Sequence, residues 1–342
     1  MKAARLHTYD EDHLHVDDIP EPKLQGPHDV IVRVGAAGLC RTDLHIIEGV
    51  WRGTLDPELP YTLGHENAGW VHEVGESVTA VQPGDTVILH PKASCGVCAT
   101  CRKGEDMYCP DGPFPGLDSE GGFAEYIRTS ERALVKMAPN LEPKQVAPFA
   151  DAGLTAYRVA KKAARVLPPG STCVIIGIGG LGHISLQCLL ATSAADIIGV
   201  DLNPEHRKHA EELGANHAVE GGDGVVERVK ELTGGDGVEA VIDFVGEHGT
   251  TEQGPAMLKP GGTYFVVGYG GTVSVPALTY IFNEVSTVGT LVGSYTDLSE
   301  LMELAARDKV RLSMREYPLD DINRSIDDLY AGTFQGRAVL VP

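Results

Sequence analysis

The sequence lacks an uninterrupted apolar run that is long enough to cross a bilayer. Its longest apolar region, residues 173–200, is broken by several glycines and by His183, Gln187 and Asp196. We therefore expect no transmembrane helix and no membrane partner. Residues 1–16 also lack the apolar core of a secretory signal. The expected location is accordingly the cytoplasm.

Basic residues are scarce relative to acidic ones. The chain has 28 Lys and Arg against 48 Asp and Glu, which gives a formal net charge of −20. Such a surface repels phosphate backbones and anionic lipid, so we expect no nucleic-acid partner. At 342 residues, with 42% hydrophobic residues, the chain is expected to fold into two domains.

Four of the seven cysteines fall within fifteen residues, in the pattern CxxCxxCx7C: Cys95, Cys98, Cys101 and Cys109. Without a secretion signal, this clustering indicates metal binding rather than disulfides. Four thiolates around one ion form a closed zinc site, which is structural because it leaves no position open. An iron–sulfur cluster is the main alternative, but its bacterial motif has only three residues before the fourth cysteine. Unligated thiols remain a second alternative.

The N-terminal half carries short alternating runs bounded by Gly, Pro and Asp, at residues 30–34, 68–74 and 86–89. This pattern predicts a mainly β, barrel-like domain whose loops carry the metal ligands.

A second candidate metal site lies between Gly38 and Gly69. Cys40 and His65 offer a thiolate and an imidazole, a combination that favours zinc, and Glu66 follows directly. Asp43 is a candidate to orient His65 by accepting its second ring proton. A buried core cysteine and a hydrogen-bonded histidine are the alternative interpretation.

From residue 168 onward the pattern changes to alternating strands and helices. Strands are expected at 172–176, 197–200, 239–243, 262–268 and 287–292, and helices at about 181–194, 204–213 and 225–232. The alternation predicts a parallel, doubly wound sheet. Further along, a helix is expected at 298–306 and a closing strand at 338–341.

A glycine motif, GIGGLG, joins the first of these strands to its helix and spans Gly177, Gly179, Gly180, Leu181 and Gly182. With Asp201 lying 19 residues beyond its last glycine, the motif has the full context of a dinucleotide fingerprint. A carboxylate at this place accepts ribose hydroxyls and repels a 2′-phosphate, so NAD is predicted over NADP. Arg207 is interpreted as a solvated helical charge.

The CRTDLH run at Cys40–His45 and the GHE triplet at Gly64–Glu66 resemble those of the zinc-dependent medium-chain alcohol dehydrogenases. The resemblance extends over nearly the whole chain. It implies a GroES-like catalytic domain at 1–152 and 293–342, with a structural zinc lobe at about 91–112. It also implies an NAD-binding Rossmann domain at 153–292.

The same resemblance supplies a third ligand for the catalytic zinc. Asp151, in ADAGLTAY, stands where many family members carry a cysteine. Glu66 remains the alternative third ligand, or an exchangeable one. Asp151 could equally be a helix N-cap.

Further residues are placed by resemblance alone. Expected cofactor contacts are Thr155, Asn203, Val245, Gly268, Val292 and Arg337. Trp51, Phe114 and Leu117 are candidates for the substrate pocket, although ordinary core packing is the favoured explanation for each one taken singly. A homodimer or homotetramer is expected, with apolar strands near 273–292 extending the sheet across a two-fold axis.

The chemistry implied is hydride transfer between NAD and an alcohol, aldehyde or ketone, with two zinc ions in each subunit. Thr42 would take the alcohol proton and pass it towards His45 and solvent. A polyol or amino-alcohol dehydrogenase on the same scaffold is the nearest alternative. A zinc-free quinone reductase is disfavoured by Cys40 and His65, and a noncatalytic NAD-binding zinc protein is the non-enzyme alternative.

Overall fold

The computed structural model describes residues 1–9 and 13–342 in two compact units. Unit 1 comprises Met1–Leu154, Gly293–Ala306 and Leu312–Pro342, and unit 2 comprises Thr155–Val292 and Arg307–Arg311. The sequence placed 307–311 with the catalytic domain, and this assignment needs correction. The backbone of Arg311 exchanges two hydrogen bonds of 2.9 Å with the side chain of Gln187, which ties the segment to unit 2.

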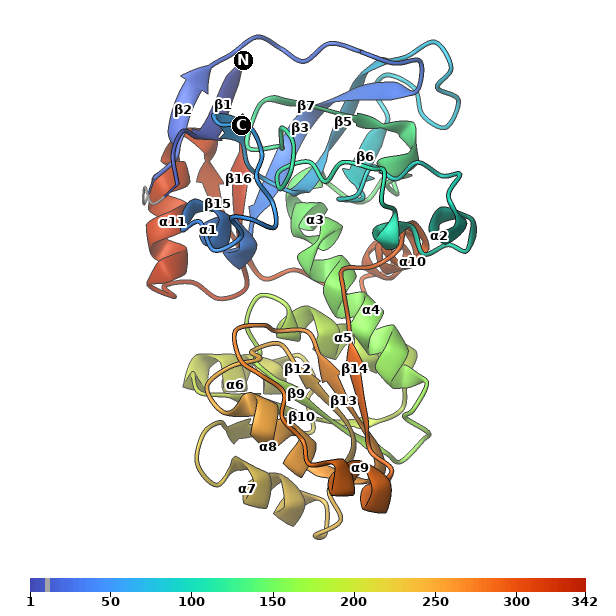
Figure 1. Cartoon of the computed structure of the whole chain (residues 1–342), viewed down its shortest axis with the longest axis vertical. Helices are drawn as coiled ribbons and strands as arrows, with labels where there is room; N and C mark the ends of the chain where they lie inside the picture. The colour runs from blue at the N-terminus through green and yellow to red at the C-terminus, as the bar shows by residue number, and fades with distance from the viewer. Residues whose placement is uncertain (10–12) are drawn as a thin grey trace. The chain divides into compact units, whose positions relative to one another are not determined.

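Unit 1 is organised around the long strand β3 (Asp29–Leu39). It pairs antiparallel with β5 (Glu66–Val74), β7 (Tyr126–Ser130) and β16 (Arg337–Val341). Almost every β3 side chain is buried, because strands or core side chains cover both faces. In Figure 1 the C-terminal β16 (red) lies beside the N-terminal β3 (blue), so the two ends of the chain meet in one sheet.

The remaining strands of unit 1 complete two sheets, and the predicted mainly β domain is confirmed. The larger sheet has the order β15-β16-β3-β5-β6-β8, and the smaller has the order β2-β1-β4. These strands are β1 (Lys2–Leu6), β2 (His15–Asp18), β4 (Tyr61–Thr62), β6 (Thr86–Leu89), β8 (Leu134–Lys136) and β15 (Met314–Pro318).

Short helices cover this β core. Helix α1 (Arg41–Ile47) buries Leu44, Ile46 and Ile47 in it, beside Leu63 and Phe123. The other helices of unit 1 are α2 (Ala99–Arg102), α3 (Pro143–Val146), α10 (Tyr295–Ala306) and α11 (Ile322–Tyr330), with 3-10 turns η1 (Asp106–Tyr108), η2 (Glu131–Ala133), η3 (Ala147–Ala150) and η4 (Leu319–Asp321). Helix α4 (Ala152–Ala164) begins in unit 1 and continues into unit 2.

Unit 2 is a six-stranded parallel sheet with the order β11-β10-β9-β12-β13-β14. Its strands are β9 (Thr172–Ile176), β10 (Asp196–Asp201), β11 (His217–Glu220), β12 (Val238–Asp243), β13 (Leu258–Val266) and β14 (Ser286–Gly289). In terms of chain order this is 3-2-1-4-5-6, the doubly wound order of dinucleotide-binding sheets, which reverses between β9 and β12. The predicted Rossmann architecture is confirmed.

The helices of unit 2 are α5 (Gly182–Thr192), α6 (Pro204–Glu212), α7 (Val225–Leu232), α8 (Thr250–Ala256) and α9 (Ala277–Asn283). The expected apolar strand near 273 is wrong, because this region leads into α9. Pro276 stands at the N-cap of α9, where its fixed φ and missing amide suit a helix start and not a strand ladder. Only β14, shorter than predicted, forms strand here.

Among the residues that the structure describes, no helix is both long and apolar enough to cross a membrane.

Gly182 lets α5 begin directly against the end of β9. A Cβ at this position would lie 1.9 Å from the carbonyl oxygen of Gly177, whereas a Cβ at Gly179 would meet no atom within 4 Å. We predict that Gly182→Ala lowers stability by about 1–3 kcal/mol, the usual cost of forcing atoms into a packed site. Gly179→Ala, the matched control, should leave the melting temperature unchanged. Equal melting temperatures for the two variants would contradict this account of the loop.

Candidate metal centres and dinucleotide site

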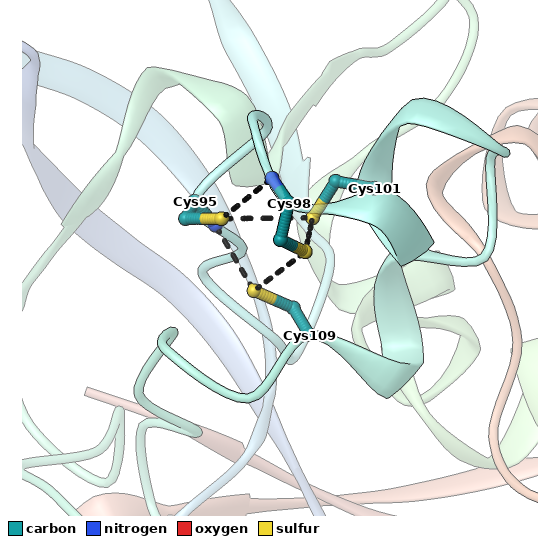
Figure 2. Close-up of side chains that lie close together, drawn as sticks. All are labelled: Cys95, Cys98, Cys101 and Cys109. Atoms are coloured by element: carbon teal, nitrogen blue, oxygen red, sulfur yellow. Dashed lines mark hydrogen bonds between the residues drawn. The ribbon is translucent and has the colours of Figure 1, made fainter.

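The four clustered cysteines converge on one point of unit 1. Figure 2 shows their sulfur atoms facing one another, with Cys98 and Cys101 3.3 Å apart, Cys98 and Cys109 3.9 Å apart and Cys95 and Cys101 4.0 Å apart. A disulfide needs about 2.05 Å, so these thiols are unbonded. Sulfurs around one tetrahedral zinc, at about 2.3 Å from the ion, lie roughly 3.8 Å from each other. The cluster fits a zinc ion.

Local hydrogen bonds prepare this loop for a cation. The backbone amides of Cys95 and Cys98 donate to the sulfurs of Cys109 and Cys95, at 3.3 and 3.4 Å. The hydroxyl of Thr100, 3.1 Å from Cys98 Sγ, is the main reason that the pKa of Cys98 falls to about 6. A thiol with that pKa is largely thiolate at neutral pH, which is the form that ligates metal.

The second cluster gathers three separate parts of unit 1. Cys40 immediately precedes α1, His65 and Glu66 stand at the start of β5, and Asp151 lies between η3 and α4. One ligand atom from each of these four residues lies within 4.8 Å of the others. Cys40, His65 and Glu66 are buried, and Asp151 is partly exposed. The structure therefore brings together the residues that the sequence proposed as metal ligands.

Asp43 supports two of these residues at once. Its Oδ2 accepts the backbone amide of Cys40 at 2.8 Å, and its Oδ1 lies 3.3 Å from Nδ1 of His65. Asp43 is completely buried. Asp43 therefore lies close to His65, as expected of a residue that orients the imidazole. Thr42 and His45 lie on the same helix, α1, and both are partly exposed.

The fit to a cation rests on His65. It is 2% exposed, yet neither ring nitrogen has a hydrogen bond with acceptable geometry among the described residues. Nε2 is 3.5 Å from an oxygen of Asp151. Burial opposes the imidazolium, but Asp43 and Asp151 outweigh it and raise the pKa of His65 well above its ordinary range. An orphaned buried nitrogen among acidic groups is what a metal ion between these donors would resolve.

Glu66 already accepts hydrogen bonds from other residues of the protein. Both of its carboxylate oxygens accept from Nη2 of Arg337 at 2.6 Å, and Oε1 also accepts the amide of Ala152 at 3.1 Å. Burial raises the pKa of Glu66 and Arg337 opposes this effect, while Glu66 in turn raises the pKa of Arg337 against burial. This geometry favours Asp151 over Glu66 as the third ligand.

Arg337 was expected to contact the cofactor, and its buried pairing with Glu66 was not foreseen. No sequence signal links two residues 271 positions apart. Its role at the cofactor stays a prediction.

The three substrate-pocket candidates lie in different surroundings. The ring of Phe114 is 6.2 Å from that of His65, edge to face. Trp51 and Leu117 pack, partly buried, against the core of unit 1. Phe114 is therefore the one that the structure places beside a metal ligand.

In unit 2 the glycine loop is held by the acid that follows it. Asp201 ends β10, and its Oδ2 accepts the amide of Ile178 at 2.8 Å. The open space at Gly179 leaves room for a phosphate above the N-terminus of α5, where backbone amides and the helix dipole favour an anion. Loop, helix and carboxylate together fit a dinucleotide.

Among the other predicted cofactor residues, Gly177, Val245 and Gly268 lie close together after the carboxyl ends of β9, β12 and β13. A Cβ at Gly177 would lie 2.9 Å from Val245, and one at Gly268 would lie 2.4 Å from the backbone of Val245. Asn203 caps α6 by accepting the amide of Glu205 at 2.9 Å. Thr155 is buried on α4, and Val292 ends the first segment of unit 2 in a left-handed conformation with φ 38°.

The sequence interpretation did not identify Asp243 and His206 at this edge, and it gave Arg207 a different role. Asp243 is buried and accepts the amides of Val245 and Gly246, so it shapes the loop after β12. His206 lies 3.1 Å from Asp201, a contact that the five-residue spacing at a helix start could have suggested. Arg207, interpreted as a solvated charge, instead donates to the carbonyls of Asp201 and Leu202.

A four-thiol site and a mixed thiolate–imidazole–carboxylate site in one unit, with a dinucleotide-type sheet in the other, define a metal-dependent dehydrogenase. Comparison with known proteins agrees. Residues 26–139 match the alcohol dehydrogenase GroES-like domain, and residues 180–307 match the zinc-binding dehydrogenase domain. The chain belongs to the zinc-binding alcohol dehydrogenase family, and it is an oxidoreductase.

Individual relatives cover the full chain. The crystal structure of an alcohol dehydrogenase from Aeropyrum pernix is 47% identical, with a TM-score of 0.96 and complete coverage of both chains. An NAD-dependent alcohol dehydrogenase of Sulfurisphaera tokodaii is 35% identical over 100% of each chain. A D-arabinose 1-dehydrogenase (NADP(+)) of Saccharolobus solfataricus is 36% identical over 100% of this chain and 97% of its own.

The two metal clusters should respond differently to loss of a ligand. We predict that Cys98→Ser removes one zinc equivalent and lowers the melting temperature, because a structural site contributes its binding energy to folding. Cys40→Ser should remove the other equivalent and abolish turnover with little change in melting temperature. Zinc analysis and calorimetry on both variants measure this. Two retained equivalents in either variant would contradict the ligand assignment.

The Glu66–Arg337 pair should be costly to break from one side. Arg337→Met leaves a buried carboxylate unpaired, so we predict a loss of about 3–5 kcal/mol in unfolding free energy. The double variant Glu66→Gln with Arg337→Met removes both charges and should recover part of that loss. Urea unfolding of the single and double variants gives the comparison, and a double variant less stable than Arg337→Met would refute the pairing.

Proposed function

We propose that this chain is an NAD-dependent, zinc-containing alcohol dehydrogenase that interconverts alcohols with aldehydes or ketones. The observation that carries the proposal is the convergence of Cys40, His65 and Asp151, with both nitrogens of His65 buried and unsatisfied. Sulfur, nitrogen and carboxylate donors in one partly accessible cluster are typical of a catalytic zinc site, which keeps a position open for substrate.

Cys40, His65 and Asp151 would hold the zinc, and Asp43 would keep His65 in the ligating orientation. A zinc ion held there supplies the Lewis acidity that makes an alcohol hydroxyl easier to deprotonate. Glu66 and Arg337 brace the start of β5 and the start of α4, and so keep His65 and Asp151 in register.

Thr42 and His45 are the proposed proton path. Thr42 lies two residues from Cys40 on the first turn of α1, and its hydroxyl can accept the alcohol proton as it passes its own proton on. His45 is partly exposed, and an imidazole can both accept and donate a proton, which suits delivery of that proton to solvent.

The choice of NAD rests on Asp201. The names of the relatives do not decide it, since one specifies NAD and another NADP(+). Asp201 has a lowered pKa because hydrogen bonds from His206, Asn203 and Ile178 outweigh its burial, so it is ionised at neutral pH. An ionised carboxylate accepts ribose hydroxyls and repels a 2′-phosphate.

Two zinc ions per subunit, a cytoplasmic location and a homodimer or homotetramer belong to the same proposal. Two donor clusters support the zinc count. Seven free cysteines suit a reducing compartment. Leu278, Ile281 and Phe282 project from α9, which contacts β13 near the sheet edge at β14, and are more than 60% exposed, an apolar surface suited to a second copy.

The deciding experiment combines a zinc count with NAD-linked turnover on short-chain, cyclic and aromatic alcohols, and on D-arabinose. Turnover on the simple alcohols that disappears after chelation is the expected result. Preference for D-arabinose would indicate the polyol alternative, which the Saccharolobus relative represents by name. NAD binding without metal-dependent turnover on any substrate would indicate a noncatalytic protein.

Removing the charge of Asp201 should weaken the binding of NAD and reduce the discrimination between NAD and NADP. We predict that Asp201→Asn raises the KM for NAD about tenfold and narrows the gap to NADP, because a neutral amide no longer repels the phosphate. Asp196→Asn, at the exposed opposite end of β10, is the matched control and should behave as wild type. Steady-state kinetics with both cofactors test this; unchanged KM values for Asp201→Asn would refute it.

A further inference from the structure

Donors of the protein itself already occupy most of the hydrogen-bond acceptor positions of the Asp201 carboxylate. Oδ2 accepts the amide of Ile178 at 2.8 Å and lies 3.1 Å from Nδ1 of His206, while Oδ1 accepts the amide of Asn203 at 2.8 Å. An ionised carboxylate has about four acceptor positions, so roughly one is left. The two adjacent hydroxyls of an NAD ribose need two. They must therefore compete with His206 for Oδ2.

His206 differs from the other two donors because an imidazole can gain a positive charge as pH falls. Ile178 and Asn203 donate backbone amides, which stay neutral and stay in place. A carboxylate oxygen only accepts, so Nδ1 of His206 carries a proton in this contact and a further proton is added at Nε2. When it is added, the contact becomes a charge-assisted hydrogen bond, which is stronger and harder for a ribose to displace.

We propose that His206 determines how strongly the chain discriminates NAD from NADP, and that this discrimination weakens as the imidazole becomes protonated. The inference deepens the proposed function and rests on it, because it requires Asp201 to face the adenosine ribose. An NADP ribose donates only one hydroxyl here, which the remaining acceptor position can serve. Its 2′-phosphate is an anion that an imidazolium attracts and a neutral imidazole does not.

The charges around this position give the sign of the effect. Asp201 is negative throughout, because its pKa is lowered. Arg207 is always positive, and its Nη1 is fixed to the carbonyl oxygens of Asp201 at 2.9 Å and Leu202 at 2.8 Å. Protonation of His206 changes the sum of these three side chains from neutral to positive. NADP therefore gains relative to NAD as pH falls.

The surroundings of His206 raise its pKa above that of a free imidazole. The hydrogen bond with Asp201 raises the pKa of His206 and partial burial opposes this. Asp201 is its one ionic partner among the described residues. Other titratable groups near α6 are Glu205, Arg207, Lys208, His209, Glu211 and Glu212 on the helix itself, His183 on α5, and His217 and Glu220 on β11. The ring of His183 lies near that of His209, which follows His206 on α6 by about one turn.

The test is the ratio of the dissociation constants of NADPH and NADH, measured by titration of the metal-loaded protein from pH 5.5 to 8.5. In the wild type the ratio should fall by about fivefold or more towards low pH, the low end expected for one charge at about 4 Å. His206→Gln should keep a high ratio and lose the part of the pH dependence that belongs to the imidazole. His206→Lys, with a permanent charge, should keep a low ratio across the range.

The 2′-phosphate also titrates near pH 6, but it does so equally with every variant. The difference between wild type and His206→Gln therefore isolates the imidazole. His217→Gln, an exposed histidine on the neighbouring β11, is the matched control and should follow the wild type. Parallel pH profiles for wild type and His206→Gln would overturn the inference.

Failure of the inference can be told apart from failure of the proposed function. If Asp201→Asn changes the ratio and the His206 variants do not, only the role of His206 is refuted. If neither dinucleotide binds, or Asp201→Asn leaves both constants unchanged, the proposed cofactor site itself is wrong.

Discussion

The buried ion pair between Glu66 and Arg337 is the interaction on which the metal centre depends. It joins the first residue of β5, the first residue of β16 and, through the amide of Ala152, the first residue of α4. His65 precedes Glu66 in the chain and Asp151 precedes Ala152. Two of the proposed metal ligands are therefore adjacent in the chain to residues that contact this ion pair. Burying such a pair is costly unless its hydrogen bonds are satisfied. Both oxygens of Glu66 have partners here, whereas Nε of Arg337 has none among the described residues.

Carboxylates with little exposure also hold backbone amides elsewhere in the molecule. Asp43 binds the amide of Cys40, Asp201 binds those of Ile178 and Asn203, and Asp243 binds those of Val245 and Gly246. In each case the side chain lies at or near the end of a helix or strand. It accepts hydrogen bonds from backbone amides of a loop, which have no partners in a regular helix or sheet. Ionised acceptors make stronger bonds to such amides than neutral ones, so loops without regular structure are held rigidly enough for chemistry.

This arrangement also links loop structure to the charge that a ligand meets. The negative charge at Asp201 holds the glycine loop through Ile178, and the same charge faces the proposed ribose position. In our proposal, protonation of His206 at the start of α6 changes the net charge at this position. In the proposed function a single carboxylate thus connects the local stability of the loop with the choice of cofactor, and we expect a substitution of this residue to affect both.

Local patterns in the sequence were sufficient for much of this molecule. The spacing of Cys95, Cys98, Cys101 and Cys109 predicted a cluster because all four lie within one short loop. The strand, glycine motif and acid of unit 2 predicted a parallel sheet, since period and turn chemistry are local properties. The strand near 273 was wrong, because apolar content alone does not separate strand from helix and Pro276 starts a helix there.

Only the tertiary structure distinguished the two candidate acids, because it pairs one of them, Glu66, with Arg337. Glu66 and Asp151 look equivalent in the sequence, and the difference arises because β16 pairs with β3 and brings Arg337 to Glu66 across 271 positions. For His206 the five-residue spacing from Asp201 is a sequence signal, but the 3.1 Å distance between the two side chains comes from the structure. Composition and spacing determine which elements form and what chemistry their side chains carry. Sheet register and helix packing determine which of those side chains meet, because they set distances that no local pattern encodes.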